Sequence, residues 1–98
     1  MHARVSHVAG SPDNADQGIE SFRTTTLSQL KSQDGNRGAI LLIDRSSGKG
    51  MAITLWEDEA AMQSSEDWAD AARRSASEQM GGSGEAQVER YEVAVFET

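Results

Sequence analysis

Two histidines, His2 and His7, are the only side chains in this sequence whose ordinary pKa lies near neutrality. His2 stands beside the N-terminus and is predicted to be inert. His7 falls on the same strand face as Ala3 and Val5, because side chains alternate with a period of two. An imidazole in that setting could be a general base. The alternative is a hydrogen-bonded polar residue in a partly buried sheet.

The aromatic residues are the other candidates for a site, since the chain has only two Trp, one Tyr and two Phe. Trp56 and Trp68 either fill the core and an interface or stack on a flat aromatic substrate. Tyr91 and Arg90 are adjacent, so they point to opposite strand faces. One could line a pocket between helices and sheet while the other meets a partner. Arg90 shares its face with Glu92, which favours an ion pair over a substrate clamp.

Composition excludes several classes of function. Sixteen acidic residues against nine basic ones give a net charge of −7, which disfavours nucleic acids and anionic membranes as partners. The absence of cysteine removes thiolate nucleophiles and disulfides. The acidic run Glu57–Glu59 suits the N-terminus of a helix better than a metal site, so no metal is predicted. Arg73 and Arg74 are expected on a solvated helix face. With neither a signal peptide nor a membrane span in the pattern, a cytoplasmic protein is predicted.

Hydrophobic periodicity predicts six elements in the order strand, helix, strand, strand, helix, strand. They cover residues 3–9, about 13–32, 38–44, 51–56, 57 to a glycine-rich stop at 81–84, and 88–96. In the first strand, apolar residues alternate with Arg4 and Ser6, which predicts one apolar and one polar face. Pro12 fits the first turn of the first helix.

This order is the split βαββαβ pattern of α+β ferredoxin-like folds, and it predicts one domain over residues 1–98. Right-handed crossovers place strands 3–9 and 51–56 in the centre of a four-stranded antiparallel sheet, with both helices on one face. Strand 38–44 is apolar on both sides, which is typical of a strand that is covered twice. A second copy of the sheet is the simplest cover for the other face, which gives a dimeric α/β barrel.

Over essentially its whole length the sequence resembles the dimeric α/β-barrel superfamily that includes the antibiotic-biosynthesis monooxygenases. The segments that carry the resemblance are 18–23, 36–39, 42–50, 53–61 and 88–93. The resemblance implies a homodimer and a cofactor-independent monooxygenase that acts on a small aromatic or polyketide-type substrate. In such an enzyme the substrate itself supplies the electrons to oxygen, and no cofactor is needed.

For that enzyme, His7 would be the base, Tyr91 a hydrogen-bond donor and Trp56 a pocket wall, with Trp68 and Arg90 as further substrate-binding residues. The haem-degrading branch of the superfamily uses an Asn on the first strand with a Trp and a His on the second helix. Here only Trp68 is present, so haem degradation is disfavoured. A second reading, a non-enzymatic small-molecule-binding or structural dimer, is favoured by the few ionisable residues in the predicted interior.

Overall fold

The computed structural model describes residues 1–8, 10–79 and 87–98, with backbone alone for 75–79. Ala9, the predicted end of the first strand, and the predicted stop at 81–84 lie outside the described residues. The strands are β1 (His2–Val8), β2 (Asn36–Ile43), β3 (Gly50–Trp56) and β4 (Gln87–Glu92). The helices are α1 (Ala15–Ser21), α2 (Leu27–Lys31), α3 (Glu59–Ser64) and α4 (Glu66–Gln79).

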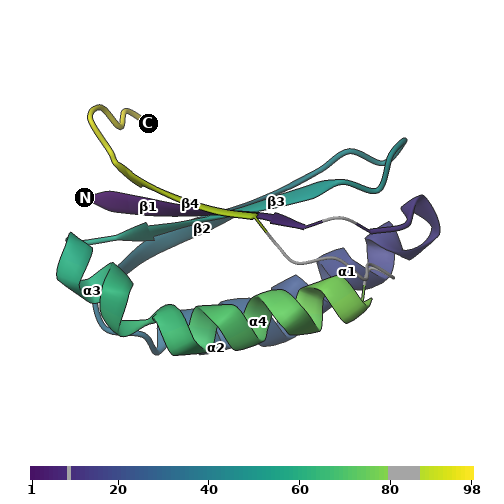
Figure 1. The fold of residues 1–98 in the computed structure, drawn as a ribbon, viewed down its shortest axis with the longest axis horizontal. Coiled ribbons are helices and arrows are strands. Elements are labelled where there is room, and N and C mark those ends of the chain that lie inside the picture. Colours follow the sequence, from purple (N-terminus) through teal and green to yellow (C-terminus); the bar gives the residue numbers. More distant parts are fainter. Residues whose placement is uncertain (9, 80–86) are drawn as a thin grey trace.

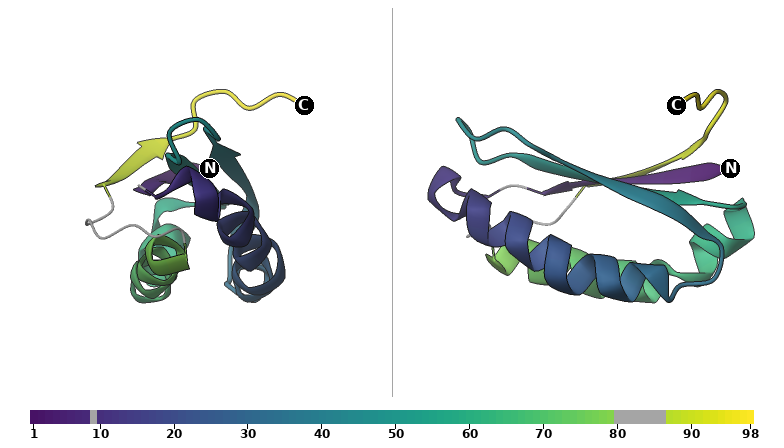
Figure 2. Two further views of the ribbon diagram at one scale, coloured as in Figure 1. Left: turned by 90° about the vertical axis from the view of Figure 1, so that its right-hand side faces the viewer. Right: turned by 180° about the vertical axis from the view of Figure 1, so that it is seen from behind.

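The four strands form one antiparallel sheet in the order β2-β3-β1-β4. The central positions of β1 and β3 confirm the predicted α+β ferredoxin-like fold. The helices in the described part of the chain all lie on one face of the sheet (Figure 1). The α1–α2 segment and the helix α4 run side by side, in one layer, beneath the strands (Figure 2).

The sequence predicted one regular first helix, but the structure shows an irregular one. It begins with a 3₁₀ turn, Pro12–Asn14, and a π-helical turn, Phe22–Thr26, separates α1 from α2. The Oγ1 of Thr24 donates to the carbonyl oxygen of Glu20 at 2.8 Å, a side-chain-to-backbone bond of the kind that bends helices. Single π turns of this kind are frequent at functional sites.

The second helix is interrupted, where the sequence predicted one helix. Asp58 caps α3, since its Oδ1 accepts from the backbone N–H of Ala61 at 2.8 Å. The break falls at Ser65, whose hydroxyl donates to the carbonyl oxygen of Met62 at 2.8 Å. This local bond competes with the continuing helix, so α4 starts in a new direction.

The last strand ends at Glu92, and its predicted extension to residue 96 is wrong. Glu92 pairs with His2, the first residue of β1, and the Val93 N–H still donates to the Met1 carbonyl oxygen at 2.8 Å.

The core lies between the sheet and the helices and is centred on Leu30, Trp56 and Met62. Strand β1 turns its polar stripe toward this layer: Arg4 and Ser6 are buried. The polar face predicted for this strand is therefore the one that turns toward the helices. The opposite face of the sheet is apolar but open, and Ile40 and Leu42 are 43% and 48% exposed there.

Candidate functional site

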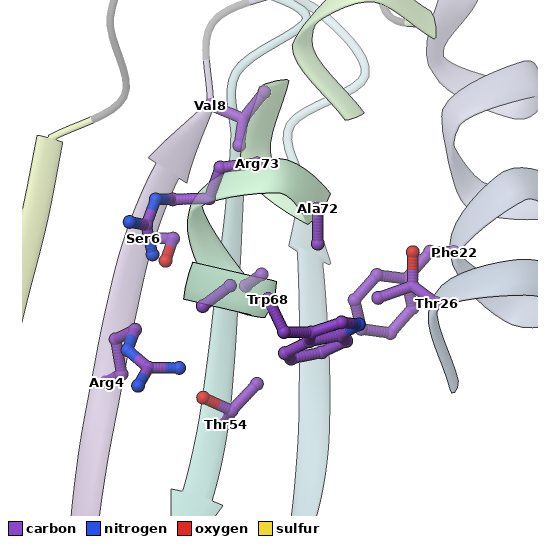
Figure 3. Close-up of a pocket in the computed structure, with 11 residues that line it drawn as sticks. Arg4, Ser6, Val8, Phe22, Thr26, Thr54, Trp68, Ala72 and Arg73 are labelled. Atoms are coloured by element: carbon purple, nitrogen blue, oxygen red, sulfur yellow. The ribbon is translucent and has the colours of Figure 1, made fainter. Parts of the chain in front are cut away.

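A pocket lies between the sheet and the helices: β1 and β3 form one side, and the π turn and α4 form the other (Figure 3). Its volume is about 50 Å³, which exceeds the roughly 10–15 Å³ that one water needs. The walls are mainly apolar. The lining residues are Arg4, Ser6 and Val8 of β1; Ala52 and Thr54 of β3; Phe22 and Thr26 of the π turn; and Trp68, Ala69, Ala72 and Arg73 of α4.

Arg4 brings a buried positive charge to one end of this pocket. Its side chain is 1% exposed, and its Nη2 donates to the Met62 carbonyl oxygen and to Ser65 Oγ. Nε and Nη1 have no hydrogen-bond partner among the described residues. Burial lowers the pKa of Arg4, although Glu66, 3.3 Å from Nη2, works in the opposite direction. The guanidinium also lies over the ring of Trp56, 5.4 Å from its centroid.

Arg73 contributes a second guanidinium from α4. Its side chain is 12% exposed, so the expectation that it lies on the solvated face is wrong. Nη2 lies 3.6 Å from an oxygen of Asp70, and Nη1 is buried without a hydrogen-bond partner in the described part of the chain. Burial lowers the pKa of Arg73 as well, and its charge helps to lower the pKa of Arg4. The two cations are therefore close enough to repel each other.

Glu66 is the carboxylate that balances this end of the site. It accepts two hydrogen bonds from Arg90, at 2.7 and 2.9 Å, besides its contact with Arg4. The Arg90 hydrogen bond, opposed by burial, holds the pKa of Glu66 below its ordinary value. Arg90 lies on the same strand face as Glu92, as expected, but the ion pair that it forms is with Glu66 on α4.

Trp68 forms the aromatic wall. Its indole N–H donates to Gln29 Oε1 of α2 at 3.0 Å, and this hydrogen bond connects α4 to α2. Phe22 and Thr26 reach the same wall from the π turn (Figure 3). The π turn therefore has a local consequence, because it directs both side chains to the cavity.

The five predicted site residues do not come together in one place. Trp56, Trp68 and Arg90 are on the side of the sheet that faces the helices, whereas His7 and Tyr91 are on the open face. Of the five, only Trp68 lines the pocket. Trp56 is 0% exposed and lies in the core, with its indole N–H donating to Thr54 Oγ1 at 2.9 Å.

On the open face, His7 and Tyr91 are joined through Glu89. His7 Nε2 lies 2.6 Å from Glu89 Oε1, and the Tyr91 hydroxyl donates to Glu89 Oε2 at 2.6 Å. These bonds, that of Tyr91 first, lower the pKa of Glu89, and the same hydrogen bond raises the pKa of Tyr91. A shallow groove beside His7 is lined further by Leu42, Ile43, Asp44, Lys49, Gly50 and Met51.

Arg4 and Arg73 are the pocket residues that the sequence did not reveal. Alternation placed Arg4 on the polar face of its strand without showing which face turns inward, and a neighbouring pair of arginines usually marks an exposed helix face. A possible signal was the repeat of small residues on α4, since Ala69 and Ala72 bring the helix close to the strands. Within the described residues, no group of three His, Asp or Glu side chains is arranged to hold a metal ion. None of the helices in that part of the chain is long and apolar enough to cross a membrane.

The fold is that of the antibiotic-biosynthesis monooxygenase-like proteins. A monooxygenase from the ActVA-Orf6 gene of Streptomyces coelicolor, solved with nanaomycin D, superimposes with a TM-score of 0.76 at 14% identity. It covers 99% of this chain and 92% of its own. SnoaB, a cofactor-independent oxygenase from Streptomyces nogalater, gives a TM-score of 0.67 at 14% identity over 97% of this chain and 94% of its own.

A sequence relative is the uncharacterised protein Rv2557 of Mycobacterium tuberculosis, 32% identical over 98% of this chain. The chain spans 42% of the length of that relative, and so matches less than half of it. No family model matches the sequence.

Proposed function

We propose that the protein is a cofactor-independent monooxygenase that oxidises a small aromatic or polyketide-type substrate in the pocket beneath the sheet. The observation that carries the proposal is the pocket itself. It combines two aromatic rings, Phe22 and Trp68, with buried guanidinium N–H groups that lack protein partners in the described residues. The two oxygenases with this fold, from two Streptomyces species, support the reaction class.

The reaction needs no outside reductant. When a phenol becomes a quinone, the ring loses one C–H and one O–H hydrogen. One atom of dioxygen becomes the new carbonyl oxygen, and the other leaves as water with both hydrogens. The four electrons come from the substrate, so the protein must hold the ring, exclude bulk water and favour the substrate anion.

The residues of the pocket suit those tasks. Trp68 and Phe22 offer faces and edges to a flat ring. Arg4 and Arg73 create a positive potential in a poorly solvated space, which lowers the pKa of a bound phenol or enol. The substrate anion, the species that reacts with dioxygen, is thereby stabilised. No His, Asp, Glu or Tyr belongs to the described lining, so the proton would leave to water.

The roles predicted for His7 as base and Tyr91 as donor stay proposals, and they require a substrate on the open face of the sheet. The groove beside His7 would be the place for it. In the proposed pocket, Arg90 acts indirectly, because it holds Glu66. Trp56 also acts indirectly, because its indole N–H donates to Thr54. The two locations make different predictions for mutants.

Oxygen uptake with naphthols and hydroquinones, followed together with quinone absorbance, tests the activity. We expect Trp68→Leu to lower kcat/KM by about ten-fold, the scale of an aromatic contact, and Trp68→Phe to keep most of it. A drop of roughly 10²-fold in His7→Ala or Tyr91→Phe would instead locate the chemistry on the open face. Absence of protein-dependent oxygen uptake with every phenol would refute the proposed reaction.

A non-enzymatic small-molecule-binding role is the second candidate. The observation in its favour is the missing general base among the described residues that line the pocket. It predicts saturable binding of aromatic ligands without oxygen uptake, so the same substrate panel separates the two functions.

We also propose that a second copy of this chain covers the open face of the sheet. Ile40, Leu42 and Tyr91 are each 43% to 51% exposed there, and rows of apolar side chains on a sheet favour a like surface. Native mass spectrometry should give a dimer for the wild type. Leu42→Glu should give a monomer and Lys31→Glu, an exposed change on the helix side, should not. A wild-type monomer at micromolar concentration would refute the pairing.

A further inference from the structure

Positive charge gathers at one end of the pocket, although the protein as a whole is strongly acidic, with a net charge of −7. The guanidinium groups of Arg4, Arg73 and Arg90 are close enough to interact, because the charges of Arg73 and Arg90 both lower the pKa of Arg4. Glu66 is the carboxylate that acts on all three, and it already accepts two hydrogen bonds from Arg90 and contacts Arg4. Asp70 is shared between Arg73 and Arg74. The four arginines thus outnumber the two carboxylates, which favours a further negative group here.

The hydrogen-bonding capacity of the cluster is also incomplete. Three nitrogens are buried without partners among the described residues: Nε and Nη1 of Arg4 and Nη1 of Arg73. A buried ionised donor without a partner is strongly unfavourable, and native structures rarely leave one so. Both side chains line the same cavity, from β1 and from α4, and both guanidinium groups extend into the space between strand and helix (Figure 3).

The rest of the cavity limits what can fill this place. Trp68, Phe22 and the small side chains of α4 give an apolar body, whereas the guanidinium groups of Arg4 and Arg73 lie toward β1 (Figure 3). A ligand that matches both ends has a flat apolar ring and one anionic group. The two oxygens of a carboxylate suit the Nη1 atoms of two guanidinium groups, because arginine forms its strongest hydrogen bonds to carboxylates and phosphates. The small volume favours the carboxylate over the bulkier phosphate.

We propose that the pocket binds aromatic carboxylates, with the carboxylate held by Arg4 and Arg73 and the ring against Trp68. The proposal rests on the proposed function only in taking this pocket as the substrate site. It narrows the substrate class from aromatic compounds in general to aromatic acids. It also gives Arg73 a role in substrate selection.

Binding of three ring compounds of equal size tests the inference without any turnover: benzoate, benzamide and benzyl alcohol, followed by calorimetry or by the indole N–H signals in NMR spectra. We expect benzoate to bind at least ten-fold more tightly than benzamide, the scale of one charge-assisted hydrogen bond. Inorganic phosphate, as a competitor, should displace benzoate weakly. Equal affinity for all three compounds, or full competition by phosphate, would overturn the aromatic-acid assignment.

Two arginine variants on one helix supply the matched control. Arg73→Gln should abolish the preference for benzoate. Arg74→Gln makes the same charge change one residue away on an exposed side chain and should keep the preference. Arg4→Lys retains the charge but not the fork of donors, so it should weaken benzoate binding while leaving benzyl alcohol unaffected. A preference for benzoate that survives Arg73→Gln and Arg4→Lys would refute the proposed contacts.

The outcomes separate this inference from the proposed reaction. Selective binding of benzoate without oxygen uptake by any hydroxylated aromatic acid would keep the acid-binding site and refute the monooxygenase. Oxygen uptake with neutral naphthols, together with equal affinity for benzoate, benzamide and benzyl alcohol, would keep the monooxygenase and refute the acid-binding site.

Discussion

The carboxylate of Glu66 is the group on which the buried arginine cluster depends, and Glu66→Gln is its most direct perturbation. The side chain is 28% exposed and meets both Arg4 and Arg90. A glutamine keeps the shape and one acceptor oxygen but removes the charge. Arg4, which is 1% exposed, would then remain buried without a carboxylate.

The two contacts contribute unequally to the expected loss of stability. Removing one partner of a fully buried pair destabilises by about 3–5 kcal/mol. For the contact with Arg4 we expect about 1.5–2 kcal/mol, because Glu66 is partly exposed and the glutamine keeps one acceptor oxygen. The Arg90 side chain is 44% exposed, so its pair adds only about 0.5–1 kcal/mol. We therefore expect Glu66→Gln to lower the free energy of unfolding by about 2–3 kcal/mol, or roughly 10–20 °C in Tm.

The pH dependence gives an independent check. The pKa of Glu66 is lowered in the folded protein, chiefly by the Arg90 hydrogen bond, from an ordinary value of 4.5. Its stabilising contribution is therefore complete above pH 4.5 and is lost as the pH falls through the lower, folded-state pKa. The difference in stability between wild type and Glu66→Gln should be constant near neutrality and should shrink in acid.

Urea unfolding at fixed protein concentration, followed by circular dichroism from pH 7 into the acid range, measures both effects. Glu20→Gln is the control, since its pair with Arg23 is exposed on both sides, at 62% and 68%, and should contribute less than about 0.5 kcal/mol. A loss for Glu66→Gln no larger than that of Glu20→Gln would refute the picture of a buried cation held by one carboxylate. So would a difference that stays constant in acid.

Three further changes test the fold and the pocket wall. Gly48→Ala should destabilise by about 2 kcal/mol or more, because Gly48 has φ of +79° and an added Cβ would clash with the Gly10 carbonyl oxygen; thermal unfolding measures it. Trp68→Phe removes the hydrogen bond to Gln29 and should lower stability by about 1 kcal/mol in urea unfolding, with Gln29→Leu showing a similar loss. Asp58→Ala removes the cap of α3 and should lower the unfolding free energy by about 1 kcal/mol, whereas Asp58→Asn should restore most of it.

The order of the strands could be read from the sequence because it depends on features that survive in any environment. Period-two runs, a glycine-rich hairpin and two crossovers long enough for helices leave few topologies open. The start of the first helical segment and the turn after it also followed from local chemistry, since Ser11 caps the 3₁₀ turn and Gly35 takes a positive φ in the turn before β2.

The site could not be read in the same way because its polar groups are stabilised by residues far away in the chain. Arg4 finds its acceptors 58 and 61 positions further on, at Met62 and Ser65. Alternation in β1 shows only that its two faces differ. It cannot tell which face turns inward, because the polar face can also be buried when a carboxylate and a hydroxyl, here of Glu66 and Ser65, pair with it. His7 and Tyr91 share a face of the sheet, yet that face is not the one with the pocket.

The buried arginines are hard to explain as devices for stability. Replacing a buried ion pair by apolar residues of similar volume is often neutral or stabilising, so a core built for stability alone would favour Leu or Met at the position of Arg4. The cluster also leaves three donor nitrogens without partners in the described structure, which adds to the unfavourable side. A ligand that supplies the missing acceptors removes this objection, because its binding energy is added to the folded state alone. Tm should then rise with benzoate concentration in the wild type and not in Arg73→Gln.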